Sequence, residues 1–381
     1  MTLPWDAATS AVQPPLAVVD LEAFDANAAD LVRRASGKPI RVASKSVRCR
    51  HLLARVLSQP GFAGVMAYAV PEARWLVDQG FEDVFVAYPS VDRAAMAALA
   101  AEPAQSAQVT LTIDSLEHVQ LLAGLDRPHG LRVALDVDAS LRVGPLHLGV
   151  RRSPVREPAE AVAVARAAAA AGLSVVGVMF YDAQIAGLPD TSPAVRIMKK
   201  RSAESLAQRR GAVVAAVREV ADLQFVNGGG TGSLHVTGPD PAVTELAAGS
   251  GLYGPTLFDG YDAFTPRPAA AFALPVVRHP APGFVTAFGG GYVASGPPGW
   301  SRVPSPFGRR GVRLVKSEGV GEVQTPLQGT GVRGLALGDK VWFRYAKAGE
   351  MCERFDALHL VRGDQLVETV PTYRGEGKNF G

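Results

Sequence analysis

The fold of this chain can be read outward from one stretch, Arg41-Val42-Ala43-Ser44-Lys45-Ser46-Val47-Arg48. Its first half is compact and partly apolar, as in a short buried strand, and residues 49–57 then take up helical spacing. Lys45 therefore stands at the carboxyl end of a strand, where barrels of parallel strands keep their chemistry. The alternative is an ordinary surface lysine between a strand and a helix.

Short β-rich runs alternate with helical patterns through most of the chain. They give eight candidate strands, at residues 42–44, 65–68, 84–87, 109–113, 131–137, 175–180, 223–226 and 244–248. Such alternation is typical of βα units that build a parallel sheet. Because eight parallel strands is the number that closes a barrel, we predict an α/β fold with a (β/α)8 barrel.

The two ends of the chain differ from this middle part. Prolines punctuate residues 1–14, and after Phe264 proline, glycine and aromatic residues increase while helical periodicity disappears. The second pattern is typical of a mainly β domain. We therefore predict an extended arm over residues 1–14 that pairs with the β domain, a barrel over residues 15–265 and the C-terminal β domain over residues 266–381.

Composition limits the possible partners and locations. The chain has 381 residues, 48% of them hydrophobic and 20% charged, which suits a globular protein with a large core. The formal net charge of +3 is too small to indicate nucleic-acid binding, and no aromatic residues interleave with the basic run at residues 199–201. The sequence shows neither a membrane span nor a signal peptide. Cys49 and Cys352 form no CxxC pair, so we expect a cytoplasmic protein in a reducing compartment.

A glycine-rich loop, Asn227-Gly228-Gly229-Gly230-Thr231-Gly232-Ser233, follows the seventh predicted strand. Glycines let the backbone approach an anion closely, and the exposed N–H groups can bind phosphate. Gly249, Ser250 and Tyr253 follow the eighth strand and offer further donors. Barrels commonly bind phosphate at the loops after strands seven and eight, so we predict a phosphate site here. A flexible turn is the alternative.

A lysine after the first strand and a phosphate site after the last two strands would face each other across one barrel mouth. A pyridoxal phosphate enzyme needs this arrangement, because its lysine forms a Schiff base with the carbonyl group of the cofactor. On these residues the chain resembles the fold-type III pyridoxal phosphate enzymes, which include alanine racemase, D-threonine aldolase and D-serine dehydratase. The resemblance extends from Pro15 to about Val367.

The resemblance implies a set of cofactor-binding residues. Lys45 matches the Schiff-base lysine, and Arg142 matches an arginine that approaches the phenolic oxygen of the cofactor; for Arg142 an ion pair with Asp136 or Asp138 is the alternative. Tyr181 ends the sixth strand, and Gln184 stands where the family has a histidine. The implied cofactor-binding residues are Lys45, Arg142, Tyr181, Asn227, Gly228, Gly229, Gly230, Thr231, Gly249, Ser250 and Tyr253.

The resemblance also raises the question of a metal. The aldolases and dehydratases of this family hold a divalent metal with a His-x-Cys pair near the C-terminus. Here Cys352 keeps its place and Glu350 replaces the histidine. Glutamate and cysteinate both bind zinc, so the resemblance implies a zinc or manganese site at these two residues. The alternative is that Cys352 is a small packed residue.

The activity implied by the resemblance is that of a lyase. The racemase needs a second base, a tyrosine in a Gly-Val-Ser-Tyr-Gly context, and the chain has no such sequence. We therefore expect a homodimeric lyase that dehydrates or cleaves D-β-hydroxy amino acids through a Lys45 Schiff base. A racemase that uses Tyr292 or Tyr345 as its second base is the alternative. A non-catalytic pyridoxal phosphate carrier is a further alternative, which the large second domain disfavours.

Overall fold

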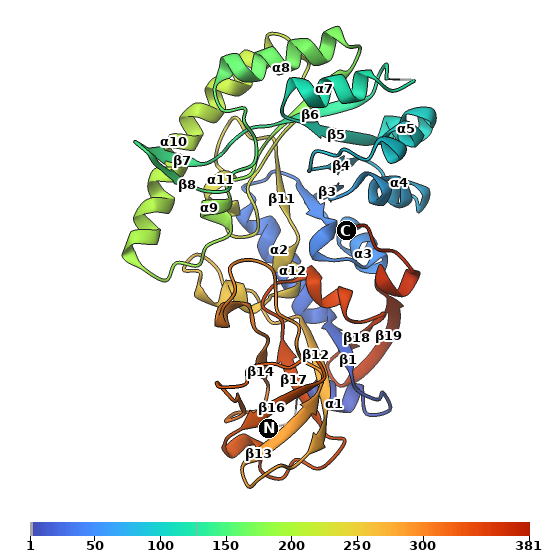
Figure 1. Cartoon of the computed structure of the whole chain (residues 1–381), viewed down its shortest axis with the longest axis vertical. Coiled ribbons are helices and arrows are strands. Elements are labelled where there is room, and N and C mark those ends of the chain that lie inside the picture. Colours follow the sequence, from blue (N-terminus) through green and yellow to red (C-terminus); the bar gives the residue numbers. More distant parts are fainter. Residues whose placement is uncertain (1–2, 127) are drawn as a thin grey trace.

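The computed structural model describes residues 3–126 and 128–381, and it consists of a barrel and a sheet domain (Figure 1). Eight parallel strands close the barrel in the order β10-β11-β2-β3-β4-β5-β6-β9. They are β2 (Ile40–Ala43), β3 (Phe62–Ala67), β4 (Val84–Val86), β5 (Val109–Ile113), β6 (Arg132–Asp136), β9 (Ser174–Phe180), β10 (Phe225–Gly228) and β11 (Glu245–Ala248). Each overlaps a predicted strand, so the predicted barrel is confirmed.

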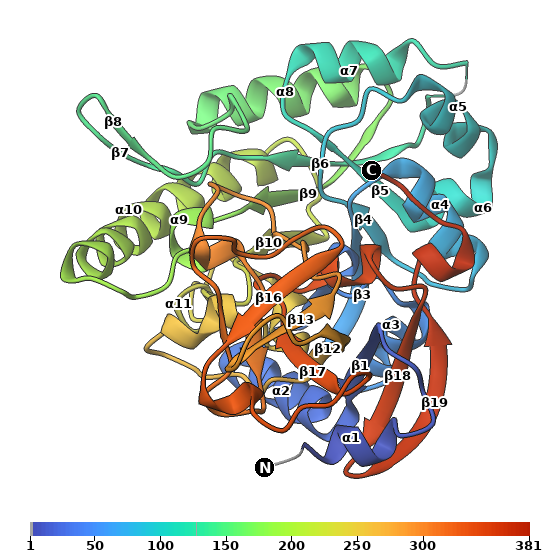
Figure 2. The ribbon, with the colours of Figure 1, turned by 60° about the horizontal axis from the view of Figure 1, so that its bottom comes forward.

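Helices lie around the outside of the barrel (Figures 1 and 2). Their first turns follow from the sequence: the Asp20 carboxylate accepts hydrogen bonds from the backbone N–H groups of Glu22 and Ala23, and Pro158 and Pro193 open two other helices. The helices are α2 (Leu21–Arg34), α3 (Arg50–Leu57), α4 (Val70–Asp78), α5 (Arg93–Ala101), α6 (Pro103–Gln108), α7 (Leu116–Ala123), α8 (Pro158–Ala170) and α10 (Pro193–Arg218), with the short α9 (Ala183–Ala186), α11 (Leu234–Thr237) and α12 (Ser250–Tyr253). None of the helices in the described residues is both long and apolar enough to cross a membrane.

A buried ion pair joins β2 to β11. The Arg41 side chain is 2% exposed, and its Nε and one terminal nitrogen donate to the two carboxylate oxygens of Glu245 at 2.7 and 2.8 Å. A further bond of 2.8 Å runs from Arg41 to the half-exposed Asp83 carboxylate. Both acidic partners therefore compensate the charge that Arg41 carries into the barrel wall.

The second domain contains a nine-stranded sheet. Its strands are β1 (Leu16–Asp20), β12 (Ala270–Arg278), β13 (Phe284–Phe288), β14 (Ser305–Phe307), β15 (Arg313–Leu314), β16 (Gln324–Gln328), β17 (Lys340–Arg344), β18 (Ala357–Arg362) and β19 (Gln365–Pro371). Strand β1 pairs antiparallel with β12 and parallel with β18 (Figure 2). The predicted barrel domain begins at residue 15 and so includes β1, but β1 belongs to the C-terminal sheet, where its backbone is hydrogen-bonded to β12 and β18.

The sequence predicts an extended N-terminal arm, but the arm is not extended throughout. Residues Pro4–Ala8 form helix α1, because Pro4 suits the first turn and the Asp6 carboxylate accepts the Leu3 backbone N–H. Trp5 is buried against Trp342, with ring centroids 5.5 Å apart. The Trp342 indole N–H donates to Asp6 at 2.7 Å. The arm therefore docks on the β domain by aromatic packing rather than by strand pairing.

Candidate active site

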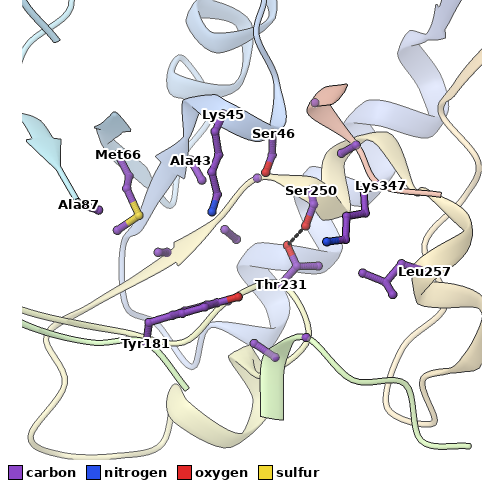
Figure 3. A pocket seen from close by; sticks show the side chains of 18 of the residues that line it. Ala43, Lys45, Ser46, Met66, Ala87, Tyr181, Thr231, Ser250, Leu257 and Lys347 are labelled. Atoms are coloured by element: carbon purple, nitrogen blue, oxygen red, sulfur yellow. Dashed lines mark hydrogen bonds between the residues drawn. The ribbon is translucent and has the colours of Figure 1, made fainter. Parts of the chain in front are cut away.

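A cavity of about 310 Å³ lies at the carboxyl ends of the barrel strands, between the barrel and the β domain (Figure 3). Its size is in the usual range for small-molecule sites. The polar residues that line it are Lys45, Ser46, Arg48, Tyr88, Arg152, Tyr181, Asn227, Thr231, Ser250, Ser295, Arg302, Lys347 and Glu350. The strand ends and the C-terminal domain thus contribute to one site.

Lys45 belongs to the short 3-10 turn Ser44–Ser46 that follows β2, and its side chain points into the cavity (Figure 3). A second short turn, Gly349–Glu353 of the β domain, packs directly on it. A Cβ atom added at Gly349 would lie 1.8 Å from the Lys45 carbonyl oxygen, so only glycine permits this approach. In the part of the chain that the structure describes, Lys45 pairs with no carboxylate; its amine is hydrogen-bonded to the Tyr88 hydroxyl.

Tyr88 and Arg152 complete a cationic corner around Lys45. The Arg152 guanidinium lies 5.0 Å from the centre of the Tyr181 ring and 5.7 Å from that of Tyr88. Burial would raise the pKa of the Tyr88 phenol, but the positive charges of Lys45 and Arg152 outweigh burial and lower this pKa from its usual value. Neither residue was predicted from the sequence, although Tyr88 directly follows a predicted strand.

The glycine-rich loop lines the cavity together with the loop after β11. Gly229, Gly230, Thr231, Gly249 and Ser250 all line the cavity, and we call them the phosphate cradle after the phosphate site that the sequence predicts there. Gly229 has φ of +76°, a backbone conformation that favours glycine. The Thr231 hydroxyl accepts hydrogen bonds from the Ser250 hydroxyl at 3.2 Å and from the Gly251 N–H at 3.1 Å. The two predicted phosphate loops are therefore in direct contact.

A buried carboxylate holds the glycine-rich loop against the end of β9. Asp182 is fully buried and accepts hydrogen bonds from the hydroxyl groups of Ser233 (2.9 Å) and Thr237 (2.7 Å). The Ser233 hydroxyl in turn accepts the N–H of Gly230 at 3.1 Å. Because Asp182 directly follows Tyr181, this network fixes the phosphate cradle relative to the tyrosine that lines the cavity.

Three of the residues implied by the resemblance lie at or outside the edge of this arrangement. Asn227 lines the cavity, but its amide donates to Glu245 at 2.8 Å, and Gly228 is buried within β10. Tyr253 is buried in α12, where its hydroxyl donates to the Val47 carbonyl at 2.7 Å. The burial of Tyr253 therefore keeps its phenol out of the cavity.

Arg142 does not line the cavity. It lies in the hairpin of β7 (Leu141–Val143) and β8 (Leu146–Leu148), which projects from the barrel (Figure 2). Its side chain is 48% exposed and forms an ion pair of 2.9 Å with Asp138. The ion-pair alternative is thus the arrangement in the structure, because the hairpin carries Arg142 outward and the segment beyond it brings Arg152 to the cavity.

The chemistry of the predicted metal donors does not fit a metal site. The Glu350 carboxylate lines the cavity, but it accepts the Ser295 backbone N–H, at 2.9 and 3.2 Å for its two oxygens. Cys352 is fully buried, its thiol donates to the Val47 carbonyl at 3.4 Å, and burial raises the pKa of the thiol far above its usual value. Among residues 3–126 and 128–381, no three His, Cys, Asp or Glu side chains converge on a point where a metal could bind. The structure therefore agrees with the alternative that Cys352 is a small packed residue.

Comparisons with known proteins agree with this geometry. Residues 19–256 match the family described as alanine racemase, N-terminal domain. Two curated relatives, each a 3-hydroxy-D-aspartate aldolase of Paracoccus denitrificans (one of them from strain Pd 1222), are 27% identical over 244 residues, which is 63% of this chain. The match spans only 60% of the length of these relatives.

Solved structures share the fold over almost the whole chain. D-threonine aldolase from Filomicrobium marinum superposes with a TM-score of 0.80 at 23% identity and covers 96% of each chain. D-threo-3-hydroxyaspartate dehydratase from Delftia sp. HT23 gives a TM-score of 0.75 at 20% identity, covering 95% of this chain and 97% of that one. The predicted arrangement of a barrel followed by a sheet domain therefore has solved counterparts.

Proposed function

Because the chain belongs to the alanine racemase N-terminal domain family, the fold-type III family of pyridoxal phosphate enzymes, we propose that it is a lyase for D-β-hydroxy amino acids. The observation that carries this proposal is the Lys45 amine, which points into a cavity that the phosphate cradle also lines. The names of the relatives support the substrate class, since they are an aldolase and a dehydratase of such amino acids.

The cavity fits pyridoxal phosphate. The phosphate cradle offers backbone N–H groups and two hydroxyls for the phosphate, and Lys45 offers an amine for the carbonyl carbon. When bound, the cofactor supplies an electron sink that stabilises negative charge at the substrate Cα. Arg152 carries a positive charge beside Tyr181 and would hold the phenolic oxygen of the cofactor, the role that the resemblance gave to Arg142.

Lys45 and Tyr88 form the proton-handling pair of the proposed site. Their side chains are hydrogen-bonded, and the lowered pKa of the Tyr88 phenol brings it closer to the range in which it can give up a proton. A Tyr88 phenolate can take a proton from the Lys45 ammonium, and the resulting neutral amine, still hydrogen-bonded to Tyr88, can then take a proton from the substrate Cα. The positive charge of Arg152 compensates the negative charge that develops when the substrate Cα loses its proton.

The alternatives have less support than the lyase. Neither tyrosine that the racemase alternative requires lines the cavity: Tyr345 is buried, and burial raises its pKa to about 12, while Tyr292 packs on Phe272 with ring centroids 5.2 Å apart. The proposed lyase includes no metal, because the donor groups of Glu350 and Cys352 are occupied or buried. A homodimer is part of the proposal, and sedimentation of the purified protein measures it.

Visible absorption spectroscopy tests the proposal. We expect the wild type to bind pyridoxal phosphate with a band that Lys45→Ala loses or shifts toward that of the free aldehyde, whereas the exposed-lysine control Lys316→Ala keeps it. Addition of D-threonine, D-serine or 3-hydroxy-D-aspartate should change the band. Glycine with an aldehyde as products would identify an aldolase, and ammonia with a 2-oxo acid a dehydratase. A wild type without any band after incubation with the cofactor would refute the proposal.

A further inference from the structure

The wall of the cavity that belongs to the β domain carries two cations that are not among the residues predicted from the sequence. Lys347 and Arg302 both line the cavity, and the Lys347 amine is hydrogen-bonded to the Ser295 hydroxyl at 3.2 Å. Figure 3 shows the Lys347 side chain pointing toward Thr231 and Ser250 of the phosphate cradle. A positive charge of the second domain thus faces the anion-binding loops of the barrel.

Neither of these two cations forms an ion pair in the described parts of the chain. The negative charge of Glu350 acts on Lys347, but this carboxylate accepts the Ser295 N–H and not the lysine amine. The Arg302 Nε atom is buried and has no acceptor within residues 3–126 and 128–381. Partly desolvated cations without partners are costly, so a wall of this composition is stabilised when an anion enters the cavity.

The charges within the wall also favour an anion in the cavity. Burial lowers the pKa of Lys347, and the positive charges of Arg302 and Lys45 lower it further, while Glu350 opposes this shift. Arg48, a further cation in the cavity wall, is already paired with Glu353. An anion beside Lys347 would relieve the repulsion among the remaining cations, whereas a divalent cation at the same place would increase it.

We infer that Lys347 and Arg302 form an oxyanion subsite, in which Lys347 contacts the oxyanion and Arg302 supports it. The inference rests on the proposed function, which supplies two candidate oxyanions of the same chemistry: the phosphate of the cofactor and the carboxylate of the amino acid. An ammonium group acts on either as a point charge, without the fixed fork geometry of arginine.

Two titrations of the full-length protein distinguish the two oxyanions. Lys347→Met removes the charge and keeps much of the side-chain length, Lys347→Arg retains the charge, and Lys316→Met is the control for an exposed lysine of the same domain. The first titration adds pyridoxal phosphate to cofactor-free protein, and the second adds 3-hydroxy-D-aspartate to the loaded protein. Both are followed by visible absorption, and circular dichroism checks folding.

A loss of about 10- to 100-fold in cofactor affinity in Lys347→Met, recovered in part by Lys347→Arg, assigns the subsite to the phosphate. The same loss in the second titration alone assigns it to the carboxylate. Affinities within about twofold of wild type in both titrations overturn the subsite, since a salt-bridged oxyanion contributes more than that. If Lys347→Met does not fold, Arg302→Met in the same titrations decides. A wild type without a cofactor band refutes the proposed function instead.

Discussion

Replacing Arg152 by methionine is the most informative single change at this site. Its guanidinium lies over Tyr181 and Tyr88 and forms no ion pair in the described residues, although its charge opposes the effect of burial on the pKa of Asp136. Folding therefore loses two cation–π contacts, about 0.5–1 kcal/mol each, and a charge that partly compensates the buried Asp136 carboxyl. The holoenzyme loses one charge-assisted contact to an oxyanion, about 1.5–3 kcal/mol, which corresponds to about a 10- to 100-fold fall in kcat/KM.

Arg142→Met is the matched control. Arg142 is exposed, and its partner Asp138 keeps Arg156 at 2.9 Å and the Ser140 hydroxyl at 2.8 Å. We expect its loss to change the free energy of unfolding by less than about 1 kcal/mol and to leave activity unchanged.

The assay for both variants is kcat/KM with a D-β-hydroxy amino acid, together with the position of the cofactor absorption band. Both variants should fold, as judged by urea denaturation. If Arg142→Met lost activity and Arg152→Met did not, the resemblance would have assigned the phenolic-oxygen contact correctly. The argument from cavity geometry would then be refuted.

Three further perturbations test two buried charged groups of the fold and the proposal that the site holds no metal. Arg41→Met leaves the Glu245 carboxylate buried without its cation and should lower the free energy of unfolding by about 3–5 kcal/mol in urea, with recovery when Glu245→Gln is added. Burial raises the pKa of Glu72 to about 7 from its usual 4.5, so the folded state binds this proton more tightly than the unfolded state does. The free energy of unfolding should therefore fall as the pH rises from about 4.5 to 7. Urea midpoints at pH 5 and pH 8 measure this fall, which Glu72→Gln should lack. Dialysis against EDTA should leave kcat/KM within about twofold, with metal content measured in parallel, whereas a loss restored by zinc or manganese would reinstate the site at Glu350 and Cys352.

Local patterns in the sequence were sufficient to predict the barrel strands and Lys45. Strand periodicity and the glycines after β10 are properties of short segments, so the barrel and the place of a glycine-rich loop at its mouth could be predicted from composition and order alone, while phosphate binding by that loop stays a prediction. The position of Arg142 could not, because it depends on how far the β7–β8 hairpin projects before the chain returns with Arg152.

Residues contributed by the second domain were harder to predict. Lys347 reaches the cavity only because Gly349 allows its turn to pack on Lys45, and this is a contact between segments at opposite ends of the sequence. The same packing buries Cys352 and Tyr253 against Val47, so residues that the family motif marks as functional have structural partners here.

Strand β1 lies between β12 and β18, so the sheet is assembled from the first and the last parts of the chain. A ribosome releases the N-terminus first, and every barrel strand leaves it before β12 does. During that interval β1 has two unpaired edges, which are exposed to pairing with other nascent chains. A chain interrupted before β12 would thus carry the barrel strands with β1 unpaired, and it would lack the cavity wall to which Lys347 belongs.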